Sequence, residues 1–211
     1  GSGNGGVSLS NVTGPTNFKD LSLATSSGAA PAFALSNAGS VTVPAASTAT
    51  LSATGGPAVD VTGTAGASLA FDSVSSTNSA NDGVNIAGLG TGTFSATGGT
   101  LTGAQGIAFD LDGGSATVGY AGQIDNGSGA SVEVTNRSGG VVTFSGSITD
   151  GPDAGGGITL TSNSGATVNM TGAVNLSTGG GAAFTATGGG TVTVTGSPST
   201  LATTTGTALE V

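Results

Sequence analysis

The sequence contains no cysteine, no histidine and no tryptophan, and only 6% of its 211 residues are charged. The lack of cysteine excludes disulfide bonds and thiolate chemistry. Two basic residues, Lys19 and Arg137, stand against eleven acidic ones, so the net charge is −9. A chain so poor in basic groups lacks the positive surface that nucleic acids and anionic membranes attract. Its apolar runs are only a few residues long, so we expect no nucleic-acid partner and no membrane insertion by this segment.

Short apolar pairs recur along the chain at nearly constant intervals. One residue separates the two members of each pair, which is the alternation of a β-strand with one buried face. The first members lie 23 to 27 residues apart, and such a period is typical of repeat architectures. The pairs are Val7/Leu9, Phe33/Leu35, Val59/Val61, Val84/Ile86, Ile107/Phe109, Val132/Val134, Ile158/Leu160, Ala182/Phe184 and Leu209/Val211.

Two further apolar series follow within each repeat, separated by glycine-containing turn signals. The second series includes Leu69/Phe71, Val118/Tyr120, Val142/Phe144 and Val168/Met170, and the looser third includes Leu51, Val74, Leu101, Ile124 and Ile148. Three short strands per repeat predict an all-β fold, a right-handed parallel β-helix (β-solenoid) of about eight coils of roughly 25 residues each. We expect residues 1–211 to be one such segment of a longer repetitive protein, with residues 1–30 as an irregular first coil.

Two other folds are less consistent with this pattern. An antiparallel β-sandwich also has many short strands joined by glycine turns, but its strands do not recur as a constant unit. Helices are disfavoured because Gly, Thr, Ser and Val dominate and no apolar period of 3.6 residues is present.

The repeat unit itself resembles a known class of protein. The segments GITLTSNSGATVNMTGAV (157–174) and ASVEVTNRSGGVVTFSGSI (130–148) are similar to the β-strand repeats of bacterial surface proteins. This class includes autotransporter passengers and filamentous-haemagglutinin-like adhesins. The resemblance covers nearly the whole chain and implies a right-handed parallel β-helix that is secreted or attached to the cell surface.

Carboxylates are the first candidates for a site. Asp110 and Asp112 flank Leu111 and so point the same way from a strand, where they are weak candidate metal ligands. Asp60, Asn85 and Glu133 hold the matching outward position in other coils, but Ala108 and Thr159 interrupt the row. We therefore expect no structural calcium and no cofactor.

A bank of small hydroxyl side chains is the second candidate. The outward positions of the second strand series include Thr143, Thr167, Thr171, Thr191, Thr193 and Thr195. Regular threonine ranks on solenoids resemble ice-binding surfaces, although threonine also suits any exposed strand. Five of the seven phenylalanines (Phe33, Phe71, Phe109, Phe144 and Phe184) fall on inward positions, and no tryptophan or spare tyrosine remains to stack on sugars.

These observations favour a passive role. Polysaccharide-active β-helix enzymes need clustered carboxylates or a Lys or Arg base, and here Arg137 occupies a turn where a solvated side chain is expected. We expect a non-catalytic stalk or adhesin segment of an exported bacterial protein, located outside the cell or on its surface. Its partners are adjoining repeats of the same chain and a ligand on a host or neighbouring cell. The alternatives are a module that binds ice or glycan through its Thr/Ser-rich face, and a polysaccharide-active enzyme.

Overall fold

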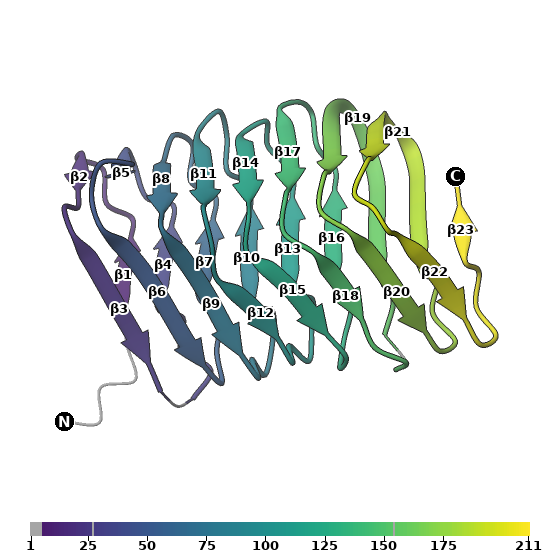
Figure 1. Cartoon of the computed structure of the whole chain (residues 1–211). Coiled ribbons are helices and arrows are strands. Elements are labelled where there is room, and N and C mark those ends of the chain that lie inside the picture. The colour runs from purple at the N-terminus through teal and green to yellow at the C-terminus, as the bar shows by residue number, and fades with distance from the viewer. Residues whose placement is uncertain (1–5, 27, 154) are drawn as a thin grey trace.

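The computed structural model describes residues 6–26, 28–153 and 155–211. Within these residues the chain is all-β without a helix, and its parallel strands stack into a β-solenoid of about eight turns, about 25 residues apart. Figure 1 shows the chain descending on the near side of the stack and climbing on the far side while it advances from the N- to the C-terminus. This path is right-handed, as parallel crossovers almost always are.

Each coil contributes one strand to each of three faces. The first face contains β1 (Val7–Ser10), β4 (Phe33–Ser36), β7 (Val59–Thr62), β10 (Val84–Ala87), β13 (Phe109–Asp112), β16 (Val132–Thr135) and β23 (Leu209–Glu210). The second contains β2 (Thr16–Asn17), β5 (Val41–Val43), β8 (Ser68–Phe71), β11 (Thr93–Ala96), β14 (Thr117–Tyr120) and β17 (Val141–Phe144). The third contains β3 (Leu21–Thr25), β6 (Ala49–Thr54), β9 (Ser73–Thr77), β12 (Thr100–Thr102), β15 (Gln123–Asn126), β18 (Ile148–Asp150), β20 (Val174–Thr178) and β22 (Thr200–Thr203).

Two long strands near the C-terminal end turn the corner between the first and second faces. They are β19 (Ile158–Met170) and β21 (Phe184–Val194), each of which contributes to both faces. The first coil already carries all three strands, paired in parallel with those of the second coil, although its β2 has only two residues.

The register between coils confirms the predicted repeat and corrects the pair of the fifth coil. Val84 on β10 lies beside Val59 in the preceding coil and beside Phe109 in the following one. The inward pair of the fifth coil is therefore Phe109/Leu111 and not Ile107/Phe109. A shift of two residues leaves the same side chains of the strand pointing inward.

The eighth coil needs the same correction. Phe184 lies beside Ile158 of the seventh coil, so the inward pair is Phe184/Ala186. The predicted pair, Ala182/Phe184, starts two residues too early, because Ala182 belongs to the corner before β21.

A column of aromatic rings runs along the interior from Phe18 to Phe144, and the five phenylalanines predicted to point inward do so. Phe33, Phe71, Phe109, Phe144 and Phe184 are all buried, and Phe94 and Tyr120 join them. Neighbouring rings have centroids 5.1–6.1 Å apart, within the range of favourable edge-to-face and tilted contacts. The contacts link one coil to the next, so the column stabilises the stack along its axis.

The corner after the first face is set by a left-handed residue in every coil. The residue that follows each short strand of this face, or the first-face part of β19 and of β21, has a positive φ between 46° and 77°. Glycine and asparagine adopt this conformation at the lowest cost, and they fill all but one of the eight positions. The residues are Asn11, Asn37, Gly63, Gly88, Gly113, Asn136, Ser162 and Gly188.

Candidate functional site

An acidic row crosses four coils on the outside of the first face. One register position on β7, β10, β13 and β16 is occupied by Asp60, Asn85, Asp110 and Glu133, all half-buried. The prediction that Ala108 interrupts this row is wrong, because Ala108 precedes β13 and is fully buried at the corner. Thr159 on β19 follows Glu133 and ends the row, as predicted.

Asp110 and Asp112 point outward from the same side of β13, as predicted. Burial raises the pKa of Asp110 to about 7. Repulsion adds to this effect and comes from three carboxylates, those of Asp82, Glu133 and Asp112. Asp112 Oδ1 accepts hydrogen bonds from Thr135 Oγ1 at 2.9 Å and from Asn136 Nδ2 at 2.7 Å.

The acidic row is an extended surface feature in which the acids are partly satisfied by their neighbours. Asn85 Nδ2 donates to Asp60 Oδ1 at 2.9 Å, which links two of its coils. Burial also raises the pKa of Glu133, so Asp110 and Glu133 take up protons more readily than isolated carboxylates do. Among the described residues no three His, Cys, Asp or Glu side chains are grouped so that they could hold a metal ion.

The hydroxyl bank lies on the outside of the second face. Thr143 on β17 lies beside Asn169 on β19, which in turn lies beside Thr193 on β21. In the parallel row, Thr167 lies between Val141 and Thr191. The other two candidates, Thr171 and Thr195, come directly after β19 and β21.

Neither of the two outward rows of this face carries hydroxyl groups along its whole length. One row runs through Thr42, Ser68, Thr93 and Thr117 on four consecutive coils before it reaches Val141. Val141, which is 41% exposed, interrupts the row that contains Thr167. Gly119 and Asn169 flank Thr143 in the other row. The candidates therefore share one face, as predicted, but the structure divides them into short groups.

Arg137 lies inside the solenoid, which corrects the expectation of a solvated side chain. The residue is 1% exposed and follows the left-handed Asn136 at the corner. Its terminal nitrogens donate to three main-chain carbonyl oxygens, those of Gly113, Ala116 and Gly139. Burial lowers the pKa of Arg137, because its charge is removed from water.

Gly114 in the preceding coil lies next to Arg137, and its missing side chain lets it approach the main chain of Leu89. A Cβ atom at Gly114 would lie 2.0 Å from the carbonyl oxygen of Leu89 and 3.4 Å from Arg137 Nη1. Asn163 in the following coil accepts a hydrogen bond from the main-chain N–H of Arg137 at 3.1 Å. Arg137 thus joins carbonyl groups of two coils and has a structural role.

A second buried polar group occupies the corner between the third and first faces. Asn126 ends β15 and Asp150 ends β18, and these two residues are register partners in adjacent coils. They are 0% and 2% exposed. Ser131 Oγ donates to Asp150 Oδ1 at 2.9 Å. Burial raises the pKa of Asp150 to about 7, and the charge of Asp153 acts in the same direction.

Sequence reasoning missed this group, although the sequence carried a signal. Ile124 and Ile148 were assigned to the core, and Asn126 and Asp150 stand two residues after them. In a strand, residues two apart share a face. An acid two positions after a core isoleucine is therefore expected to point inward.

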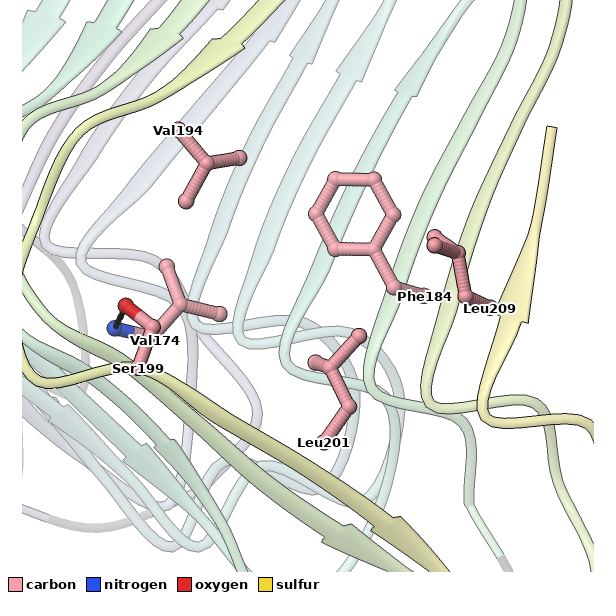
Figure 2. Close-up of a pocket in the computed structure, with 6 residues that line it drawn as sticks. All are labelled: Val174, Phe184, Val194, Ser199, Leu201 and Leu209. Carbon is pink, nitrogen blue, oxygen red and sulfur yellow. Dashed lines mark hydrogen bonds between the residues drawn. The ribbon is translucent and has the colours of Figure 1, made fainter.

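An apolar cavity opens at the C-terminal end of the stack. Figure 2 shows its lining, which comes from all three faces, and its volume is about 300 Å³. The lining residues are Val174, Phe184, Val194, Ser199, Leu201 and Leu209. Val194 and Leu209 are 43% and 54% exposed, which is unusual for large apolar side chains on inward strand positions.

No protein family matches the chain, and neither does any curated protein or solved structure. No helix among the described residues is long and apolar enough to cross a membrane.

Proposed function

We propose that this chain is a non-catalytic structural segment of an exported bacterial surface protein, where it acts as a stalk or as the rod of an adhesin. The observation that carries the proposal is the unbroken pairing of strands on all three faces. Each face continues from the first coil to the last, with every strand hydrogen-bonded to its counterparts in adjacent coils. Coils spaced by about 4.8 Å make a rod about 40 Å long, because neighbouring strands have that separation.

The basic and acidic side chains, which an enzyme would need for catalysis, are placed in a way that favours this passive role. The single lysine, Lys19, is exposed in the first coil, and the guanidinium group of Arg137 is bound by carbonyl groups inside the fold. The acids of the first face are spread over four coils with Asn85 among them. Asp110 and Glu133 are neighbours in this row, but they lie on an outward strand face and do not line the apolar cavity, so we assign them no catalytic role.

Adjoining repeats of the same polypeptide are the partners that best fit the apolar end. Leu209 is exposed, and it occupies the same register position as Phe184, which is buried in the preceding coil. One more coil would place an inward side chain over Leu209 in the same way. We further propose a location outside the cell or on its surface, and an adhesive ligand there, on the basis of the resemblance to bacterial repeat proteins.

The rod can be tested by adding one coil. A second copy of residues 187–211 joined after Val211 continues the stack in register, because Leu209 stands where Phe184 stands. We expect the longest dimension in small-angle X-ray scattering to grow by about 5 Å and the melting temperature to rise as the end is covered. A scrambled 25-residue segment of the same composition serves as the control. If the native and the scrambled additions behave alike, the stalk proposal fails.

The absence of catalysis is tested separately. Incubation with common polysaccharides should release no product above the buffer background. Product release that disappears in Asp110→Asn or Asp112→Asn would overturn the non-catalytic assignment.

A further inference from the structure

Three buried oxygen atoms near the corner after β18 have no hydrogen-bond donor. They are Asn126 Oδ1, Asp150 Oδ2 and Asp153 Oδ2. Buried acceptors without donors are rare in native proteins, because each loses its hydration without compensation. Here three such atoms belong to residues of one corner and its register partner in the preceding coil.

Hydrogen bonds fix the orientation of the two innermost groups. Asn126 Nδ2 donates to three carbonyl oxygens, those of Ala104, Gly129 and Ala130, at 3.2, 2.9 and 3.0 Å. Gly129 and Ala130 belong to the corner of the same coil and Ala104 to the preceding coil, so the amide nitrogen is fully engaged while Oδ1 has no donor. The Ser131 hydroxyl holds Asp150 Oδ1, so that Asp150 Oδ2 is the free oxygen of that carboxylate.

The corner that follows Asp150 is longer than its counterpart in the preceding coil and brings in a second carboxylate. Ile158 follows Asp150 by eight residues, whereas Val132 follows Asn126 by six. The longer corner contains Asp153, whose Oδ1 accepts from the main-chain N–H of Gly155 at 2.6 Å. Its main-chain carbonyl accepts from Gly179 in the following coil at 2.9 Å, which anchors Asp153 in the stack.

A cation satisfies this set of atoms better than a proton does. One proton supplies a single donor and can join only two of the three oxygens. A divalent cation is attracted by all three and balances the two carboxylates. Carboxylate and amide oxygens without nitrogen or sulfur ligands favour a hard cation, and Ca²⁺ tolerates the irregular geometry that such a corner offers.

We propose that Asp150, Asp153 and Asn126 form an internal calcium site that fastens the corner after β18 to the coil before it. This inference concerns the corner alone and does not depend on the stalk proposal. It departs from the expectation of no structural calcium, which rested on the acidic row of the first face, on another part of the molecule.

The test uses the full chain, stripped of metal with EDTA and titrated with CaCl₂ in a calorimeter. We expect one equivalent of Ca²⁺ to bind per chain. At a concentration about 100 times the dissociation constant, the melting temperature should rise by roughly 5–10 °C. Asp150→Asn keeps the size of the side chain and an oxygen that accepts from Ser131, but it removes the charge of one ligand. The variant should show neither the heat of calcium binding nor the calcium-dependent rise in melting temperature.

Two matched variants locate the effect. Asp125→Asn removes the same charge from an exposed position next to Asn126 and should bind calcium as the unchanged chain does. Asp110→Asn removes a charge from the acidic row and should also leave binding intact. Absence of calcium-dependent heat in the unchanged chain overturns the proposal. Binding that survives Asp150→Asn and is lost in Asp110→Asn also overturns it, because the ion then sits on the first face.

Discussion

Asp110 lies directly beside Glu133 on the neighbouring strand, and both carboxyl groups are half-buried on the outside of the first face. Burial of Asp110, reinforced by repulsion from Asp82, Glu133 and Asp112, makes the protein sensitive to pH. The pKa of Asp110 is raised from 3.8 to about 7 in the folded chain. Between these two values the folded state holds a proton that the unfolded state has lost, so stability falls as the pH rises through this window.

Asp110→Asn should remove part of this dependence. The amide keeps the size of the side chain without a charge, so the variant should be more stable than the unchanged chain at pH 8 and nearly equal to it at pH 4. Melting temperatures measured at intervals between these limits show the difference growing with pH. Asp125→Asn removes a charge from an exposed position on the third face and is the control. A difference that shrinks with pH would contradict the raised pKa.

Arg137 should be necessary for stability although its side chain donates hydrogen bonds to main-chain carbonyl oxygens and not to a carboxylate. Arg137→Met leaves the buried carbonyl oxygens of Gly113 and Ala116 without their side-chain donor. The expected loss in the free energy of unfolding is about 2–3 kcal/mol, measured by urea denaturation. Lys19→Met causes the same change in net charge at an exposed position and should cost about 0.5 kcal/mol or less. Equal effects of the two substitutions would place Arg137 in solvent.

The sequence was sufficient for the fold because the strand period and the 25-residue repeat recur in every coil. It was insufficient where an alternating run is longer than one strand. Ile107, Phe109 and Leu111 alternate across three positions, and a period of two cannot decide which two belong to the strand. Only the partner strands settle this, since Phe109 lies between Val84 and Val132. That error hid the acidic row, because it put Ala108 in the place of Asp110.

Arg137 was misplaced for a different reason. The carbonyl oxygens that hold its side chain include those of Gly113 and Ala116, more than twenty residues earlier in the chain. A local reading of the turn cannot detect partners in another coil. For Asp150 only the partner escapes a local reading, because Ser131 lies 19 residues away while the inward direction follows from the position of Ile148.

The hydroxyl bank should not bind ice. Ice-binding requires a regular lattice of hydroxyl groups, and here Val141 and Gly119 interrupt the two rows of the second face. We expect thermal hysteresis at micromolar protein to be indistinguishable from that of buffer. Thr200→Lys, on the third face, is the control. Faceted ice growth that is abolished by Thr193→Lys and kept in Thr200→Lys would favour the alternative of an ice-binding module.

Register on the second face gives the sharpest test of the fold, because neighbouring residues should respond in opposite ways. Phe144 is 1% exposed and lies between Tyr120 and Met170 of the adjacent coils, with its ring 5.1 Å from that of Phe109. Phe144→Asp would bury an unpaired carboxylate and leave a cavity, each of which costs several kcal/mol. We expect at least the local coils to unfold.

Thr143 points outward from the same strand, so Thr143→Asp should cost about 1 kcal/mol or less. Urea denaturation followed by circular dichroism, together with limited proteolysis, measures both variants. Because Phe144→Asp could abolish expression, Phe144→Leu provides a folded comparison that should lose about 1 kcal/mol, as a smaller apolar side chain in a tight core does. A one-residue slip would exchange the two positions and make Thr143→Asp the damaging change. Equal sensitivity at both positions would instead mean that the two sides of β17 do not differ in burial, which contradicts the register of the solenoid.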